Sequence, residues 1–276
     1  MISSRIEPLA DFVRAHPRLF VLTGAGVSTA SGIPGYRDDA GQWQRSPPVT
    51  HQQFVGSDAV RRRYWARSML GWPVIAGAAP NPAHAALARL EWGGHVEQLV
   101  TQNVDGLHQR AGSARLIELH GSLHAVVCLD CGAREERSSV QSRLARANPA
   151  LASLEAATAP DGDADLERNF DAFAVPACAC CSGVLKPDVV FFGGSIPRPV
   201  AAAAMEALHA ADALLVAGSS LMVYSGFRFC AAAQVAGKPI AAINRGRTRA
   251  DNLFALKIEA DCVAALAELS EQLGCT

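Results

Sequence analysis

The sequence predicts an α/β protein: a doubly wound parallel sheet with a smaller zinc-binding and helical domain inserted into it. Short apolar runs alternate along the chain with stretches of helical patterning. Strands that are covered by helices on both faces read as continuous apolar runs, so this alternation indicates a parallel sheet. Two Cys-x-x-Cys pairs lie on either side of a long insertion and indicate a separate metal-binding unit.

Apolar runs identify the strands of the expected sheet and one further extended segment. The strands are Leu19–Thr23, Val96–Thr101, Arg115–Leu119, Ala213–Ala217 and Pro239–Ile243, and the extended segment is Val189–Phe192. Helices are expected within Leu9–Val13, Arg61–Leu70, Ala83–Leu90, Ala201–Ala210, Phe227–Ala236 and Cys262–Leu273. Residues 147–165, rich in alanine, proline and aspartate, are expected to loop out.

Glycine or polar residues follow each of these strands. The polar segments begin at Gly24, Gln102, His120, Gly218 and Asn244. Ligands of open parallel sheets bind outside the carboxyl ends of the strands, so we expect these segments to converge on one crevice.

The composition is that of a globular protein without a strong charge preference. Of the 276 residues, 50% are hydrophobic, and the net charge is −1 from 25 basic and 26 acidic side chains. This balance argues against binding to nucleic acid or to an anionic membrane through bulk charge. No apolar stretch approaches the roughly 18 residues of a membrane span, and Met1–Glu7 is polar and unlike a signal peptide. We therefore expect a cytoplasmic protein with reduced cysteines.

Four cysteines have the spacing of a tetrahedral zinc site. Cys128 pairs with Cys131, and Cys178 pairs with Cys181. Four protein ligands leave no open position for chemistry, so the site is expected to be structural. The alternative is a set of buried or disulfide-bonded cysteines. Cys180, between two of the ligands, is expected to be a bystander, although its thiol has the chemistry to replace one of them.

The segment Gly24-x-Gly26 after the first strand suggests phosphate binding, because glycines let the backbone approach a pyrophosphate. A third glycine of the usual fingerprint is missing, since its position holds Thr29. The alternative is a tight strand-to-helix turn. Ser31–Arg37 follows as a shaped loop in which Arg37 either contacts phosphate or is solvated.

Other strand ends carry polar groups with similar alternatives. Gln102–Asp105 offers amides and a carboxylate for ribose hydroxyls or a small amide, or else caps the next helix. His120 is either structural or a general base, because neutral imidazole suits that role near pH 7. Gly218–Ser220 and Asn244–Gly246 either hold an adenosine ribose or phosphate, or form ordinary turns.

In this order, these segments resemble the sirtuins, the NAD-dependent protein deacylases. The matching pieces are Gly24–Ser28, Ser31–Pro34, Thr101–His108, His120–Ser122, the two cysteine pairs, Lys186–Gly193, Gly218–Leu221 and Ile243–Asn244. The match spans nearly the whole chain. Arg63–Arg67, Asp161–Asp163 and Val223–Gly226 resemble the class II branch of that family.

The resemblance implies a Rossmann domain that holds NAD⁺ and a smaller domain, with an acylated lysine of a protein or peptide entering the cleft between them. The Rossmann part would comprise about 1–42, 92–122 and 188–276, the helical part about 43–91 and the zinc part about 123–187. NAD⁺ is consumed: nicotinamide leaves and the acyl group passes to ADP-ribose. One structural zinc ion and a monomeric chain are also expected.

The resemblance also implies the site residues. His120 would be the general base, with Asn103 and Asp105 at the nicotinamide pocket. Substrate backbone would pair with the segment Val190, Phe191, Phe192 and Gly193 as an added strand. The implied cofactor contacts are Gly24, Ala25, Gly26, Ser28, Tyr36, Arg37, Gln102, Asn103, Asp105, Gly218, Ser219, Ser220, Asn244, Arg245, Gly246 and Cys262.

Two positions depart from the family pattern. Gly35 and Gly194 stand where sirtuins usually have an acidic residue, and the loss of each carboxylate is expected to loosen the cofactor loop or the substrate strand.

Tyr64 and Arg67 are three residues apart, so a helix places them on one face. A similar Tyr-x-x-Arg pair binds an acyl carboxylate in the desuccinylase branch of the family, and a charge-assisted arginine contact suits that task. We therefore hypothesise activity on acidic or bulky acyl groups. The alternative is a helix whose arginine is solvated or pairs with an acid.

The sequence leaves two alternative functions open for this protein. The same pocket and leaving group suit mono-ADP-ribosyl transfer to a protein. A third hypothesis is a zinc-ribbon binding module without catalysis. The presence of His120, Asn103 and Asp105 at the positions of the family's site residues argues against it.

Overall fold

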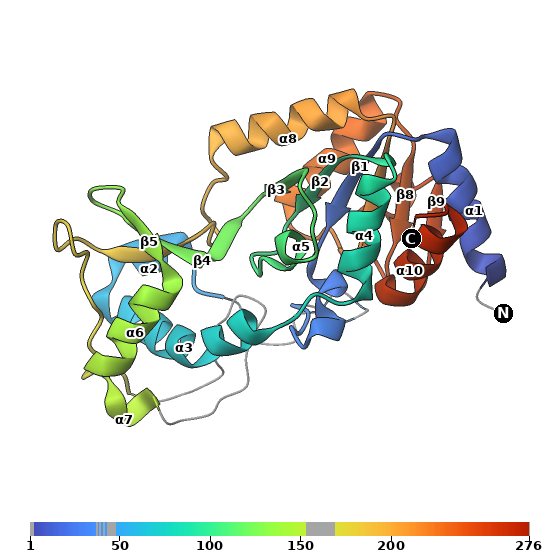
Figure 1. Cartoon of the computed structure of the whole chain (residues 1–276). Helices are drawn as coiled ribbons and strands as arrows, with labels where there is room; N and C mark the ends of the chain where they lie inside the picture. The colour runs from blue at the N-terminus through green and yellow to red at the C-terminus, as the bar shows by residue number, and fades with distance from the viewer. Residues whose placement is uncertain are drawn as a thin grey trace.

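The computed structural model of the chain describes residues 3–36, 38, 40, 42, 48–152 and 169–275. A large sheet with its helices forms one end of the molecule, and a smaller group of helices and strands forms the other (Figure 1). Among these residues, no helix combines the length and apolar character needed to cross a membrane.

The large sheet has six strands in the order β3-β2-β1-β7-β8-β9, and all neighbouring strands are parallel. Its strands are β1 Leu19–Thr23, β2 Val96–Thr101, β3 Leu116–Glu118, β7 Ala213–Ala217, β8 Ile240–Ile243 and β9 Leu256–Ile258. The chain winds outward from β1 to β3 and then from β7 to β9, so the order reverses between β1 and β7. The predicted doubly wound parallel sheet is confirmed.

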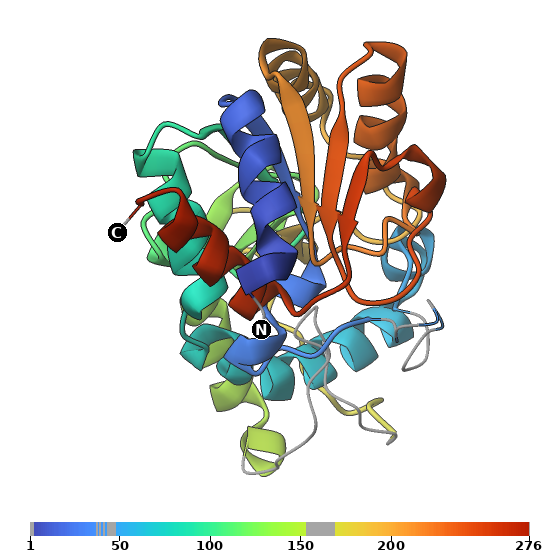
Figure 2. The same cartoon turned by 90° about the vertical axis from the view of Figure 1, so that its right-hand side faces the viewer.

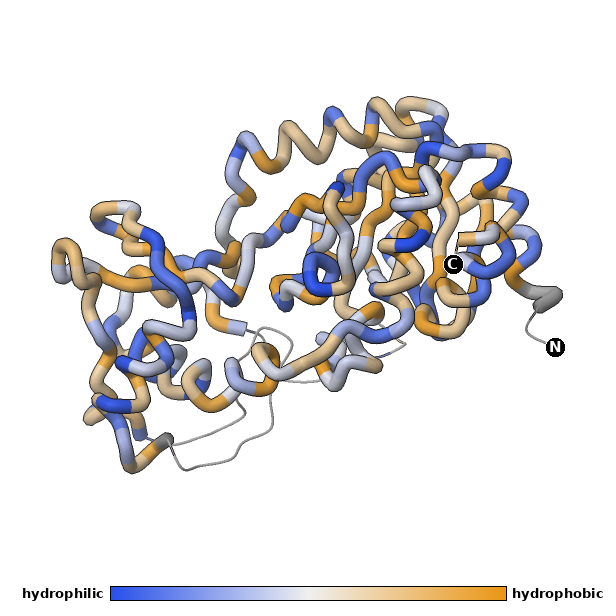
Figure 3. Tube along the Cα trace, in the orientation of Figure 1, coloured by the Kyte–Doolittle hydropathy of each residue, from blue (hydrophilic) through white to orange (hydrophobic). Residues whose placement is uncertain are grey.

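Helices cover both faces of this sheet, which is why its central strands are apolar on both sides. Leu19 and Val21 of β1 belong to the core under α1 Ser3–Ala15, α4 Pro82–Trp92 and α10 Cys262–Gln272. Phe20 and Leu22 face α8 Arg198–Ala210 and α9 Tyr224–Val235. Figure 2 shows α1 in blue and α10 in red side by side, and Figure 3 shows the apolar strands and a largely apolar α8. Burying each large apolar side chain contributes about 1.5–3 kcal/mol.

The smaller part joins two helical segments to an antiparallel sheet of order β5-β4-β6. The strands are β4 Gly121–Cys128, β5 Arg134–Glu136 and β6 Leu185–Val189, and the helices are α2 His51–Gly56, α3 Asp58–Gly77, α6 Arg137–Ala147 and α7 Pro149–Ala152. Short helices complete the chain: α5 Leu107–Arg110 and the 3₁₀ turns Ala25–Val27, Thr29–Ser31 and Asp251–Leu253.

A buried arginine ties α6 to α3. The Arg137 guanidinium lies 5.2 Å from the ring centroid of Trp65 and 4.9 Å from that of Trp72. It donates to the carbonyl and hydroxyl oxygens of Ser68. Burial lowers the pKa of Arg137 to about 10, so the side chain stays cationic at neutral pH between the two aromatic faces.

The structure departs from the predicted elements at several points. The extended segment expected at Val189–Phe192 begins at the last residue of β6, and Phe192 forms a parallel bridge to Thr50. β9 was not predicted, since three residues give no readable apolar run. β4, α2 and α6 were also not predicted. Within the expected loop 147–165, α7 occupies Pro149–Ala152, and residues 153–165 lie outside the described residues.

Candidate active site

A cavity of ≈ 910 Å³ opens at the carboxyl edge of the large sheet. The residues that follow five strands all line it: Gly24, Gln102, His120, Gly218 and Asn244. Ala260, Asp261 and Cys262, which follow β9, line it as well. The predicted convergence on one crevice is confirmed, and the unpredicted sixth strand adds to the same wall.

The glycines after β1 lie against the turn that follows β7. Gly24 N–H donates to Ala217 O at 3.1 Å, and Gly26 N–H donates to Gly218 O at 2.9 Å. A Cβ atom at Gly26 would lie 2.8 Å from the Cα of Gly218, and Gly218 itself has a φ of +60°. These positions therefore need glycine for the chain itself, and β1 runs directly into a 3₁₀ turn, Ala25–Val27.

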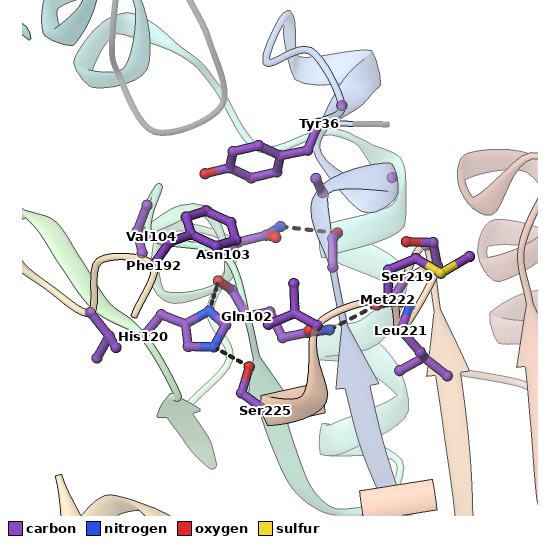
Figure 4. A pocket seen from close by; sticks show the side chains of 18 of the residues that line it. Tyr36, Gln102, Asn103, Val104, His120, Phe192, Ser219, Leu221, Met222 and Ser225 are labelled. Atoms are coloured by element: carbon purple, nitrogen blue, oxygen red, sulfur yellow. Dashed lines mark hydrogen bonds between the residues drawn. The ribbon is translucent and has the colours of Figure 1, made fainter. Parts of the chain in front are cut away.

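His120 is held in one tautomer. Its Nδ1 lies 2.9 Å from the carbonyl oxygen of Gln102, and since a carbonyl only accepts hydrogen bonds, Nδ1 must carry the hydrogen. The lone pair of the neutral ring is then on Nε2, which lies 2.9 Å from Ser225 Oγ (Figure 4). Burial lowers the pKa of His120, the bond to Gln102 opposes this, and the nearby Arg228 charge lowers the pKa further. The ring is therefore neutral at pH 7, as a general base requires.

Two amide side chains tie the strand ends together. Gln102 Nε2 donates to Ser219 Oγ at 2.9 Å and to Thr23 O at 3.1 Å. Asn103 Nδ2 donates to Gly24 O at 3.1 Å and to Ser28 Oγ at 3.0 Å. These bonds fix the amides across β2, β1 and β7, so their free oxygens are oriented before any ligand arrives.

Asp105 and Ser28 line a separate small cavity of ≈ 20 Å³ beside the main one. The two cavities share five lining residues: Ala25, Tyr36, Gln102, Asn103 and Val104. Asp105 is 3% exposed, and its carboxylate accepts from Ser28 Oγ at 2.7 Å and from Leu107 N–H at 3.0 Å. The bond to Leu107 is the capping interaction that was one of the alternatives for this segment.

Two buried histidines, His84 and His108, contact residues next to the small cavity. The sequence analysis did not identify either as a site residue. Their rings lie 4.8 Å apart, and burial lowers the pKa of His84 to about 4 and that of His108 to about 3. His108 Nε2 lies 3.0 Å from Thr23 Oγ1, and His84 Nε2 lies 3.4 Å from Ser28 Oγ. The available signal was His84 at the third position of the capping box that starts α4 at Asn81.

The predicted substrate residues line the main cavity with one exception. Tyr64 and the segment from Val190 to Gly193 line the main cavity. Phe191 packs on Tyr64, with ring centroids 5.1 Å apart, and Val190 N–H donates to His120 O at 2.8 Å. Arg67 is half-buried and is not among the described residues that line the cavity.

The other predicted cofactor residues are mostly at the site. Gly24, Ala25, Gly26, Tyr36, Gly218, Ser219, Ser220, Asn244, Arg245 and Cys262 line the main cavity, as do Gly35 and Gly194. Arg245 also pairs with Asp261 at 3.6 Å. Gly246 is not among the lining residues, and its carbonyl accepts from Lys257. Arg37 and the Asp161–Asp163 insert lie outside the described residues.

Five further lining residues were not identified as site residues from the sequence. Ser225 and Arg228 come from α9, while Leu221, Arg247 and Asp261 come from the turns after β7, β8 and β9. Leu221 and Ser225 lie in segments that resemble the sirtuins, and the fold brings all five to the cavity.

The four paired cysteines form one cluster away from the cavity. The Sγ atoms of Cys128, Cys131, Cys178 and Cys181 all lie within 4.8 Å of one another. Cys128 and Cys181 are 3.5 Å apart, and Cys131 and Cys178 are 3.8 Å apart, close to the roughly 3.8 Å edge of a tetrahedron with Zn–S bonds of about 2.3 Å. Cys180 is exposed and not part of the cluster. The donors and spacing fit a structural zinc ion.

The fold and the site together define an α/β enzyme of the Rossmann type, with a neutral histidine at the carboxyl edge of its sheet and a separate four-cysteine module. The chain belongs to the Sir2 family, which matches residues 24–225.

Two relatives match this chain over nearly the full length of both proteins, and both are named as NAD-dependent protein deacetylases. "NAD-dependent protein deacetylase 2" of Bradyrhizobium diazoefficiens is 58% identical over 95% of this chain and 97% of its own. "NAD-dependent protein deacetylase" of Xanthomonas campestris is 59% identical over 95% of this chain and 90% of its own. A solved structure of Sir2 with a p53 peptide and NAD⁺ has a TM-score of 0.79 and 29% identity, covering 98% of this chain and 99% of that one. The expected sirtuin family is confirmed.

The zinc site predicts opposite results for two neighbouring cysteines. Purified protein should contain about one equivalent of zinc per chain. Cys181→Ser should lose the metal and lower the thermal unfolding midpoint by about 10 °C or more, because metal binding contributes directly to folding. Metal analysis and thermal unfolding measure both effects.

Cys180→Ser is the matched control, since Cys180 adjoins Cys181 but lies outside the cluster. It should keep both the zinc and the unfolding midpoint, and equal zinc loss in the two variants would contradict the assigned ligand set.

Proposed function

We propose that this protein is an NAD⁺-dependent protein lysine deacetylase that transfers the acyl group to ADP-ribose and releases nicotinamide. The observation that carries the proposal is the neutral His120, which lines a cavity formed by the strand ends of a Sir2-family fold and keeps Nε2 unprotonated beside Ser225 Oγ. Relatives named as NAD-dependent protein deacetylases support the assignment.

The residues after β2 and β3 would act on the nicotinamide end of NAD⁺. NAD⁺ supplies a glycosidic bond whose cleavage releases nicotinamide and leaves a ribose as the acyl acceptor. His120 takes a proton from a ribose hydroxyl, and Gln102 is close enough to orient that ribose. The nicotinamide ring would lie in the part of the main cavity that Asn103 lines, next to the small cavity lined by Asp105.

The phosphates and adenosine of NAD⁺ would contact the glycine-rich turns, and the peptide would contact the segment Val190–Gly193. The phosphates and the adenosine would contact the turns at Gly24–Ser28, Gly218–Ser220 and Asn244–Gly246, together with Tyr36, Arg37 and Cys262. The acyl-lysine peptide would pair with Val190–Gly193, where backbone pairing gives little selectivity for sequence.

We make further proposals about the branch of the family, the division of the chain into domains, and the oligomeric state and location of the protein. We place the chain in the class II branch on Arg63–Arg67 and Val223–Gly226. We divide it into a Rossmann part and a small domain at the bounds given by the sequence, since the two sheets keep separate cores. We also propose a monomer, and a cytoplasmic location in which the cysteines stay reduced.

The direct test is to incubate the protein with NAD⁺ and an acetyl-lysine peptide and to follow products by mass spectrometry. Deacetylated peptide, nicotinamide and O-acetyl-ADP-ribose should appear in equal amounts. His120→Ala should lower the rate by roughly 10²–10⁴-fold, the usual contribution of a general base. Nicotinamide release with ADP-ribose attached to a protein acceptor would instead identify a mono-ADP-ribosyltransferase.

The pKa of His120 sets the acid limit of the reaction. A general base works in its neutral form, so activity is present above its pKa and is lost as the pH falls through it. Because burial lowers the pKa of His120 below 6.5, the acid limb of kcat/KM for NAD⁺ should have its midpoint below pH 6.5. A pH–rate profile measures this midpoint, and a value above 6.5 would contradict the assigned base or its environment.

We also propose that Tyr64 and Arg67 widen the acyl range to acidic groups. Tyr64 lines the cavity, and Arg67 lies one turn further along the same face of α3. Arg67→Ala should lower kcat/KM for succinyl-lysine about 10- to 100-fold relative to acetyl-lysine, the effect of losing a hydrogen bond to a charged group.

Arg63→Ala is the matched control, because Arg63 is exposed on the same helix one turn earlier. It should leave the ratio of the two rates unchanged. An equal loss for acetyl and succinyl substrates in Arg67→Ala would show that Arg67 has a structural role only.

A further inference from the structure

The first turn of α9 brings a serine hydroxyl to the catalytic histidine. Ser225 is the second residue of α9, is half-buried and lines the main cavity. Its Oγ lies 2.9 Å from His120 Nε2, and Figure 4 shows this bond on the side of the ring opposite the Gln102 contact. The imidazole is therefore held at both nitrogens by different elements of the fold.

The direction of both bonds follows from the chemistry of the partners. Gln102 O accepts from Nδ1, so neutral His120 has its lone pair on Nε2. Ser225 must then donate its hydroxyl hydrogen to that lone pair. A hydroxyl also has lone pairs, so it can accept from Nε2–H once the ring is protonated. The contact is thus compatible with both protonation states of the base.

The helix itself does not require this hydroxyl. Serine near a helix start often caps the backbone, but the N-cap of α9 is Val223 and makes no side-chain cap bond. Gly226 follows, and a Cβ atom there would collide with the Gln102 side chain, so α9 lies directly against the segment that holds His120 Nδ1. The close approach of α9 is what places Ser225 on Nε2.

We propose that Ser225 is a positioning residue for His120, on the premise that the protein is the deacetylase proposed above. Before reaction, Ser225 donates to Nε2 and keeps the ring plane aimed at the cavity. During reaction, Ser225 turns its hydrogen away and frees the Nε2 lone pair. The O–H bond of a ribose hydroxyl then breaks, an N–H bond forms at Nε2, and the electron pair stays on the ribose oxygen. Ser225 Oγ accepts from the new N–H, which stabilises the imidazolium.

Steady-state kinetics test the proposal with a substitution that removes only the hydroxyl. Ser225→Ala should lower kcat about 10-fold, the effect of losing one hydrogen bond to a charged group, with KM for NAD⁺ unchanged. Ser225→Thr keeps the hydroxyl and should restore most of kcat. Ser142→Ala, on the exposed face of α6, is the matched serine control and should behave as wild type.

Two results would overturn the proposal. Wild-type kcat in Ser225→Ala would show that the hydroxyl is a bystander. A fall in kcat with a higher KM and a lower unfolding midpoint, not restored by threonine, would show that Ser225 only supports the fold.

¹⁵N NMR of the His120 ring separates this proposal from the proposed function, because it needs no turnover. Wild-type protein should show the Nδ1–H tautomer with a hydrogen-bonded Nε2, and Ser225→Ala should change the Nε2 signal while Nδ1 stays bonded. An unchanged Nε2 signal would overturn the positioning role. If acetyl-lysine peptides are not deacetylated even by wild type, the proposed function fails, and the Nε2 signal alone then decides whether Ser225 holds the ring.

Discussion

The site depends on the close contact between the ends of β1 and β7. These strands are neighbours at the point where the strand order reverses, and the turns that follow them touch through backbone atoms. Gly26 and Gly218 have no room for a Cβ atom because the other turn occupies that space. This contact fixes the floor of the cavity, and Gln102 and Asn103 then bond across it to Ser219 and to Gly24.

Burial keeps the titratable groups around this floor in defined states. It lowers the pKa of His84, His108 and His120, so all three rings are neutral at pH 7. A neutral ring accepts or donates according to its tautomer, and the carbonyl of Gln102 decides that tautomer for His120. The wall is therefore polar, and the lone pair of His120 is fixed on Nε2, next to Ser225 Oγ.

The inserted module is joined to His120 on both of its sides. β4 begins at Gly121, directly after His120, and its partner β6 leads into Val190, whose N–H donates to His120 O. The cysteine cluster lies at the far end of β4, where Cys128 is the last residue of the strand. A zinc ion there would hold the β4 and β6 ends together and so keep the cavity-lining segment Val190–Gly193 in register with His120, at a distance from the cavity itself.

The sequence alone determined the parallel sheet, the polar strand ends and the cysteine pairs, because each depends on local patterns: apolar runs, residues that end strands, and the spacing of ligands. Tertiary structure decided the rest. The glycines after β1 were expected to admit phosphate, but their immediate neighbour is the turn after β7, which is 192 residues later for Gly26 and Gly218. His84, Ser225 and Arg228 reach the site from helices whose local sequence is that of ordinary helix starts. Local patterns report how a segment folds, whereas contacts between segments far apart in the chain depend on the packing of the whole sheet.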